Sequence, residues 1–176
     1  MLAKIQTLLL ASALVLAPAM ASAEDLIDLT RAARNPTTPA TTLHQLAEHD
    51  NVKVRRNVAS NRRAPAELLY SLASDPQVEV RIAVITNTAT DEKTHLLLTN
   101  DKDEQVRSVL ARYEYCSAAV MDKLAQDPVV EIRMEVARNW NTSLATLQKM
   151  TNDSFAEVSS SASRELTRRK LEGAEQ

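Results

Sequence analysis

A period of 26 residues organises most of this 176-residue chain and limits the folds that it can adopt. The segment "VEVRIAVITN" returns as "VKVRRNVASN" and "VEIRMEVARN", and aliphatic residues, asparagines and aspartates keep the same spacing. Four arginines mark the period: Arg55, Arg81, Arg107 and Arg133. Such a period is typical of a solenoid, in which each repeat buries its apolar face only by stacking on its neighbours.

The first half of each repeat carries helix signals. In "APAELLYSLASD", Pro65 is expected at the first helical position, and Leu68, Leu69 and Leu72 form an apolar stripe at helical spacing. At the position of Ala64, other repeats have a threonine whose hydroxyl is expected to accept hydrogen bonds from the first free amides. These threonines are Thr38, Thr90 and Thr142.

The second half of each repeat predicts a second helix. Asp75 is expected to be its N-cap, with Pro76 at the first helical position, and Val80 and Val84 face inward one turn apart. The helix is expected to stop at Asn87, because asparagine tolerates the left-handed conformation that closes many helices. We therefore expect an all-α, right-handed α-solenoid of about five 26-residue, two-helix repeats.

The periodic arginines are interpreted as a structural ladder. A guanidinium at the same place in successive repeats can reach the capping aspartate or the free carbonyls of the adjacent repeat, and its planar fork suits a carboxylate. The alternative is an arginine array that binds an anionic ligand. The ladder comprises Arg55, Arg81, Arg107 and Arg133.

The segments "DPQVEVRIAVITN" and "NRRAPAELLYSLASD" resemble the leucine-rich repeat variant family, a relative of HEAT-like helical repeats. The resemblance covers about Asp28 to Thr167. It implies two short helical segments per repeat, one of which can be a 3₁₀ helix, and a curved superhelix that serves as a binding scaffold.

Residues 1–23 are interpreted as a cleaved export signal. Lys4 is followed by the apolar segment Leu8–Ala17, and Ala21 and Ala23 fit an A-x-A cleavage pattern. An uncleaved membrane anchor is the alternative, because the uncharged run is close to spanning length. The remaining chain then comprises a solenoid at 24–172 and a short tail at 173–176.

Composition excludes several classes of site. Without Lys4, 20 Lys and Arg face 23 Asp and Glu, so the chain has no overall pull towards nucleic acid or an anionic membrane. Cys116 is the only cysteine, which excludes an intramolecular disulfide and a cysteine-ligated metal cluster. We expect a free, half-buried thiol; an intermolecular disulfide is the alternative.

The three histidines and the remaining polar residues form no recognisable catalytic or metal-binding motif. His44 is expected on an outer helix face, His49 before a helix, and His95 at a core position where other repeats have leucine or methionine. Because they fall in different repeats, they are not expected to converge on a metal. We expect no cofactor.

The last helix is expected to run on as a cap, with Phe155, Val158, Ala162 and Leu166 on one face and Gly173 closing it. Cations at its C-terminal end would suit the helix dipole. They are Arg164, Arg168, Arg169 and Lys170.

Aromatic residues gather at one edge of two adjacent repeats. Tyr113 takes the place of the periodic asparagine, Tyr115 follows two residues later, and Trp140 lies in the equivalent turn of the next repeat. Tyrosine and tryptophan suit an interaction hot spot. The alternative is that they pack over an irregular turn and seal it.

A basic patch near the second predicted helix pair is a further candidate, and its members beside Arg55 are Lys53, Arg56, Arg62 and Arg63. The nearby Glu48, Asp50 and Glu67 favour a self-neutralised, solvated surface.

We therefore expect a non-enzymatic, monomeric interaction scaffold that is exported from a bacterial cytoplasm, acts in the periplasm or outside the cell, and binds an unidentified protein partner. No membrane span is expected after signal cleavage. The first alternative is a periplasmic polyanion or cell-wall binding module. The second is an enzyme on a helical-repeat fold.

Overall fold

The computed structural model describes residues 23–174, and every regular element in this range is an α-helix. The chain divides into two compact units, here called unit 1 (described residues 23–90) and unit 2 (described residues 91–174). Among the described helices, none combines the length and apolar character needed to cross a membrane. The predicted export signal lies outside the described residues, except for its last residue, Ala23, which begins a helix.

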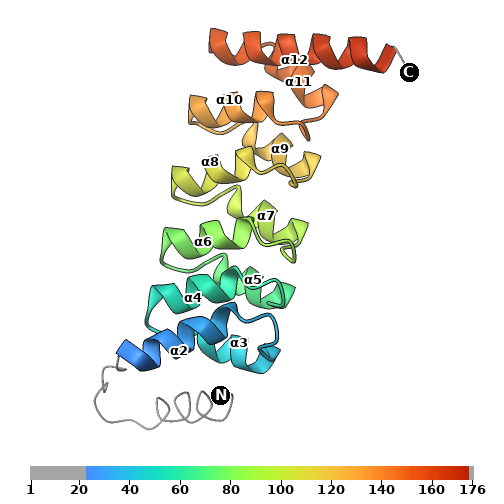
Figure 1. Cartoon of the computed structure of the whole chain (residues 1–176). Coiled ribbons are helices and arrows are strands. Elements are labelled where there is room, and N and C mark those ends of the chain that lie inside the picture. Colours follow the sequence, from blue (N-terminus) through green and yellow to red (C-terminus); the bar gives the residue numbers. More distant parts are fainter. Residues whose placement is uncertain (1–22, 175–176) are drawn as a thin grey trace. The chain divides into compact units, whose positions relative to one another are not determined.

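Unit 1 consists of an opening helix followed by two helix pairs. Helices α2, α4 and α6 pack side by side, and α3 and α5 pack against this row (Figure 1). The bounds are α2 Ala23–Arg34, α3 Ala40–Ala47, α4 Val52–Ala59, α5 Ala66–Leu72 and α6 Val78–Ile85.

Unit 2 consists of three helix pairs. Helix α10 packs between α8 and α12, whereas α7, α9 and α11 form the second row (Figure 1). The bounds are α7 Glu92–Leu98, α8 Glu104–Arg112, α9 Ala118–Leu124, α10 Val130–Arg138, α11 Leu144–Met150 and α12 Ala156–Ala174. The two units therefore contain five helix pairs among the described residues, which confirms the prediction of an all-α helical-repeat fold.

The core of each unit is built from the periodic aliphatic positions. The first helix of a pair contributes two neighbouring leucines, such as Leu68 and Leu69, and the second helix contributes residues such as Val80 and Val84, all buried. Burying such a side chain contributes about 1.5–3 kcal/mol. Other members of the periodic core are Val54, Val106, Ile132 and Val158.

The second helix of each pair begins later than predicted. Helix α6 begins at Val78, two residues after Pro76, and Asp75 is not its N-cap. The Asp75 carboxylate instead accepts a hydrogen bond from the amide of Gln77 at 2.8 Å, which forms an Asx turn before the helix. Pro65 likewise precedes α5 as its N-cap residue.

The terminal helix also differs in detail from the prediction. Phe155 precedes α12 and is 49% exposed, whereas Val158, Ala162 and Leu166 are buried as expected. The helix continues through Gly173 to Ala174, so the predicted tail at 173–176 begins inside it. Phe155 lies in the Asx turn of Asp153, whose carboxylate accepts a hydrogen bond from the Phe155 amide, and it is therefore not part of the helical face that Val158 and Ala162 share.

Candidate functional site

Three of the periodic arginines, Arg55, Arg107 and Arg133, are seen to join two successive turns in the described residues. In unit 2, Arg107 donates from Nε and Nη2 to the two carboxylate oxygens of Asp127, at 2.6 and 3.2 Å, and from Nη1 to the Asp101 carbonyl at 2.8 Å. Arg133 makes the same three bonds to Asp153 and to the Asp127 carbonyl. The carboxylate thus belongs to the next repeat, and the carbonyl belongs to the arginine's own repeat.

Unit 1 contains the same arrangement. Arg55 donates to both carboxylate oxygens of Asp75, at 2.7 and 3.0 Å, and to the carbonyls of His49 and Asp50. Arg81 is buried and donates to the Asp75 carbonyl at 2.8 Å. The hydrogen bonds to Asp75 raise the pKa of Arg55 above its ordinary value. These arginines have their hydrogen-bonding capacity largely committed to the protein itself.

The periodic asparagines do not close helices in the left-handed conformation, which corrects the sequence prediction. Asn139 has φ −72° and ψ 131°, an extended conformation. Its buried side-chain amide donates to the carbonyls of Ala111 and Tyr113 in the preceding repeat, at 2.7 and 3.3 Å. Asn61 bonds in the same way to the carbonyls of Ala33 and Asn35 in unit 1. The asparagine is therefore a bridge between repeats.

The periodic threonines also act differently from the prediction. Thr142 does not accept from the following helix; its hydroxyl donates to the Val136 carbonyl at 2.5 Å, in the helix that has just ended. Thr38 and Thr90 make the equivalent bonds. Cys116 takes this place in its own repeat, with Sγ 3.7 Å from the Leu110 carbonyl. The thiol is free and buried, and burial raises its pKa to about 12.

Two of the three predicted edge aromatics line one open groove in unit 2. Tyr115 is 78% exposed and Trp140 is 67% exposed. The groove has a volume of about 480 Å³. Its other lining residues are Ala111, Arg112, Glu114, Glu135, Arg138 and Asn139.

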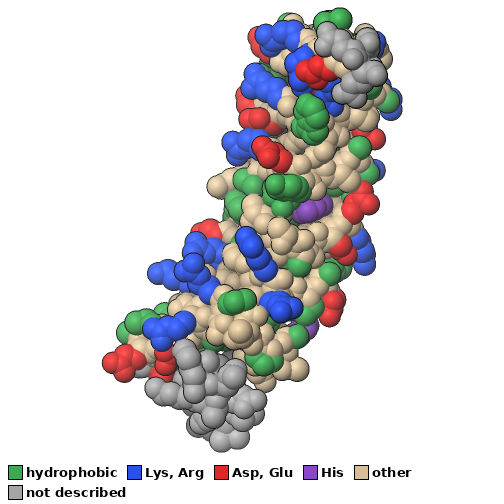
Figure 2. Space-filling view, turned by 45° about the vertical axis from the view of Figure 1, so that its right-hand side comes forward, with side chains coloured by type: hydrophobic (Ala, Val, Ile, Leu, Met, Phe, Trp, Pro, Cys, Tyr) green, Lys and Arg blue, Asp and Glu red, His purple; other side chains and the backbone are tan. Residues whose placement is uncertain are grey.

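Tyr113 supports this groove from one side. It is half-buried between His95 and Tyr115, with ring centroids 5.6 Å from each neighbour and edge-to-face geometry. On the face that Figure 2 shows, hydrophobic side chains are exposed at several places, and one of them lies beside a histidine. Edge-to-face aromatic pairs add about 0.5–1.5 kcal/mol to simple burial. Tyr113 therefore positions Tyr115 more than it offers surface of its own.

Trp140 is held by cations from α12 that the sequence pattern did not connect with it. The guanidinium carbons of Arg168 and Arg169 lie 5.6 and 5.5 Å from its ring centroid. Arg169 also donates to the carbonyls of Asn139 and Thr142, on both sides of the tryptophan turn. The two arginines share the Glu165 carboxylate and lower its pKa. The exposed indole therefore sits on an ordered support.

The histidines have different local surroundings. His44 is exposed on α3, and His49 is half-buried, where its Nδ1 accepts from the Asn51 amide at 2.9 Å. His95 is buried beside Tyr113. Burial lowers the pKa of His49. Among the described residues, no three His, Cys, Asp or Glu side chains are grouped so that they could hold a metal ion.

Comparison with known proteins finds a similarity to one repeat family. Residues 27–94 match the model of the Leucine Rich Repeat Variant domain. Over these residues, the chain is similar to the leucine-rich repeat variant family. Its repeats are similar to a solved structure described as a leucine-rich repeat variant with a novel repetitive protein structural motif, at 22% identity and a TM-score of 0.39. That alignment covers 82% of this chain and 67% of the other. No curated protein matches the chain.

Of the five residues in the predicted basic patch, four are exposed and Arg55 is engaged in a link to Asp75. Arg55 lies in the link to Asp75 and is not available at the surface in the same way as the others. Lys53, Arg56, Arg62 and Arg63 are exposed. Glu48, Asp50 and Glu67, which were expected to neutralise the patch, form no ion pair with these four residues in the described part of unit 1.

The links between periodic arginines and aspartates predict that the fold is less stable at acidic pH. The hydrogen bonds from Arg133 hold the pKa of Asp153 below its ordinary value. In the unfolded chain this carboxyl takes up a proton near pH 4, before the folded one does. The contribution of this carboxylate to the free energy of unfolding is therefore fully present above about pH 4. It is lost as the pH falls through the lower pKa of Asp153 in the folded protein.

We expect the stability of Asp153→Asn to fall less steeply than that of the native protein as the pH is lowered, because the variant has no carboxyl group at this position. Urea unfolding midpoints measured between neutral and acidic pH should fall less steeply in the variant than in the native protein. Equal slopes in the two proteins would contradict the contribution of this link.

Proposed function

We propose that this protein is a non-enzymatic interaction scaffold of the bacterial cell envelope, which binds a protein partner through the aromatic groove of unit 2. A domain of this repeat family supports an interaction scaffold in general. The observation that carries the finer proposal is the pair of exposed aromatic side chains, Tyr115 and Trp140, that line one groove. Both supply large amphipathic surfaces, the residue types enriched at binding hot spots.

Order in the free protein favours this role for the groove. Tyr115 is packed edge-to-face on Tyr113, and Trp140 rests against two guanidinium groups. A partner would therefore meet side chains that are already placed, so that little conformational entropy is lost on binding. Arg112, Glu114, Glu135 and Arg138 surround the aromatics with both signs of charge. This arrangement resembles the apolar centre and polar rim of a protein interface.

Export is proposed from the sequence of the N-terminal segment. The apolar run and the A-x-A pattern at Ala21 and Ala23 support transport out of the cytoplasm and cleavage after Ala23. The protein would then act in the periplasm or outside the cell.

The test is in-cell crosslinking of the tagged full chain, with mass spectrometry of the captured proteins. We expect a partner that is captured by the native protein and at least about tenfold less by Tyr115→Ala/Trp140→Ala, because a hot-spot side chain contributes about 2 kcal/mol or more. Phe155→Ala is the matched control, since it removes an exposed aromatic of unit 2 that does not line the groove.

The proposal fails if the same partner is captured equally by the native protein and the double variant. It also fails if Phe155→Ala reduces capture as strongly as the double variant. Unchanged circular dichroism and melting temperature of each variant are the condition for either comparison.

A further inference from the structure

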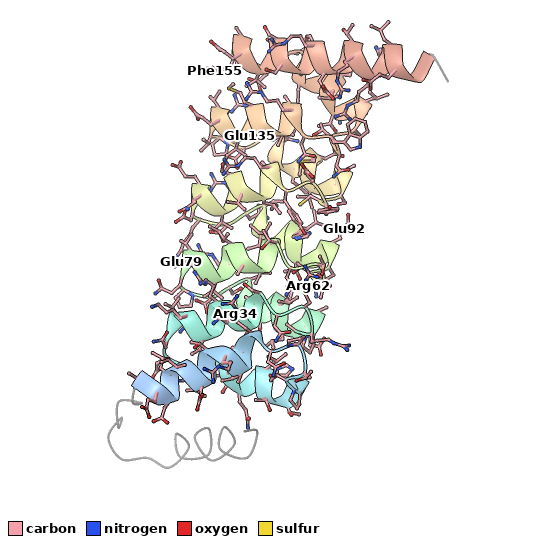
Figure 3. All side chains as sticks on the ribbon, in the orientation of Figure 1. Arg34, Arg62, Glu79, Glu92, Glu135 and Phe155 are labelled. Carbon is pink, nitrogen blue, oxygen red and sulfur yellow. The ribbon has the colours of Figure 1, made fainter. Side chains whose placement is uncertain are left out.

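Unit 1 presents four exposed arginines around two successive turns. Arg34 lies in the last turn of α2 and Arg56 in the last turn of α4, whereas Arg62 and Arg63 follow α4 in the turn that leads to α5. We call these four residues the arginine cluster. Figure 3 labels Arg34 and Arg62, which come from neighbouring turns.

Hydrogen bonds between the turns bring the cluster together. The buried Asn61 side chain donates to the Asn35 carbonyl at 3.0 Å. Arg34 directly precedes Asn35, and Arg62 directly follows Asn61. Further back along the helices, the Asn57 side chain donates to the Thr30 carbonyl at 3.3 Å, which sets the last turn of α4 beside the last turns of α2.

The turn that carries Arg62 and Arg63 is ordered from within. The Arg63 amide donates to the Asn61 side-chain oxygen at 2.9 Å, and the Ala64 amide donates to the Asn61 carbonyl at 2.9 Å. Because the backbone is fixed in this way, an anion bound by these arginines would not need to order the turn. Preorganisation of this kind favours binding.

The cluster differs from most other arginines of the protein in lacking carboxylate partners. Arg31, Arg55, Arg107, Arg133, Arg168 and Arg169 form ion pairs. Across the described residues, no ion pair includes Arg34, Arg56, Arg62 or Arg63. The cluster thus presents four guanidinium groups without an ion-pair partner among the described residues, in a chain whose net charge is −2.

We propose that the arginine cluster of unit 1 binds a linear polyanion that carries phosphate or sulfate groups. Guanidinium groups bind such oxyanions through two parallel hydrogen bonds, and they are weakly hydrated compared with ammonium groups. Successive charges along a polymer can meet arginines from successive turns.

Polar surroundings favour a polymer over a bilayer surface. The exposed residues beside the arginines include Asn35, Thr37 and Ser60. Pro36, which lies between two of them, is also exposed, but none of these residues has the long aliphatic or aromatic side chain that amphipathic membrane-binding segments insert between lipids.

The experiment measures binding of fluorescent long-chain inorganic polyphosphate to the full chain across a range of salt concentrations. We expect Arg34→Ala/Arg62→Ala/Arg63→Ala to raise the Kd at least about tenfold and to reduce the slope of log K against log salt by about 2. The matched control, Lys102→Ala/Lys123→Ala/Lys149→Ala, removes the same charge from exposed positions of unit 2 and should change the Kd less than about threefold.

A lysine triple variant at the same three positions separates geometry from charge. We expect it to keep the salt dependence of the native protein while binding more weakly, because lysine cannot form the paired hydrogen bonds.

Equal binding by the native protein and the alanine variant would overturn the proposal, and so would an equal loss in the lysine-to-alanine control. Vesicles containing phosphatidylglycerol provide the remaining arm: binding to these vesicles that requires the cluster, with no binding of polyphosphate, would replace the polymer by a membrane surface. All variants lie outside the aromatic groove, so either result leaves the crosslinking test of the protein partner independent.

Discussion

Replacing Arg107 by alanine should lower the free energy of unfolding by about 2–3 kcal/mol, the upper range for hydrogen bonds to charged groups. The change removes three hydrogen bonds and leaves the Asp127 carboxylate, which is almost completely buried, without its cation. Removing one partner of a fully buried pair costs about 3–5 kcal/mol, and the partial exposure of Arg107 places the expected value below that range. The melting temperature should fall by roughly 5–10 °C.

The control for this experiment lies on the same helix. Arg112 is exposed in the last turn of α8 and forms no ion pair within the described residues, so Arg112→Ala should change stability by less than about 0.5 kcal/mol. Urea unfolding followed by circular dichroism gives both values. If the two variants were equally stable, Arg107 would not be a structural link. The double variant Arg107→Ala/Asp127→Ala should recover part of the loss, because the uncompensated charge is gone.

Asn139→Ala should cost about 2–3 kcal/mol through a different mechanism. The substitution leaves two carbonyls of the preceding repeat, those of Ala111 and Tyr113, without the donor that joins them to the next turn. It also removes the acceptor of the Asn141 amide. Each unsatisfied buried group costs about 1–3 kcal/mol, and solvent can reach the Tyr113 carbonyl more easily than that of fully buried Ala111.

Asn141→Ala is the matched change in the same turn. Its side chain bonds to the Glu114 carbonyl at an exposed site, where water can replace the lost donor. We expect a loss below about 1 kcal/mol. Urea midpoints for the two variants would contradict the bridging role of Asn139 if they shifted by the same amount.

The repeat and its core could be predicted from the sequence because both depend on local periodicity. The spacing of residues such as Val80 and Leu72 is set by which face of a helix must be buried, and that constraint is visible within one repeat. A period of this length is typical of repeats that stack on their neighbours, so the stacking could also be predicted.

The role of the periodic asparagines could not be read in the same way. A helix-closing asparagine and a bridging asparagine both leave a short polar residue at the end of every second helix. The partners of Asn61 are carbonyls about one repeat earlier, and backbone carbonyls carry no sequence signature. The prediction for the threonines was wrong for the same reason. Thr142 donates to the preceding helix, and a threonine that accepted from the following helix would be the same residue type at the same position.

The candidate groove was partly visible in the sequence. Tyr115 and Trp140 fall at nearly equivalent positions of adjacent repeats, which predicts a shared edge. Arg168 and Arg169 were assigned to the end of a helix and its dipole, because α12 extends beyond the repeat and its residues have no periodic counterparts. Their position over Trp140 depends on the packing of α12 against α10 and α11.

The arginine links also bear on how such a chain can change its length. In unit 2, each link joins an arginine to an aspartate 20 residues later, and the next link begins 26 residues after the first. A tandem duplication of one period therefore carries both the donor and the acceptor of a new link, and the flanking links find their partners unchanged. Gene duplication or recombination can thus lengthen or shorten the protein by whole repeats without evolving a new interface at each junction.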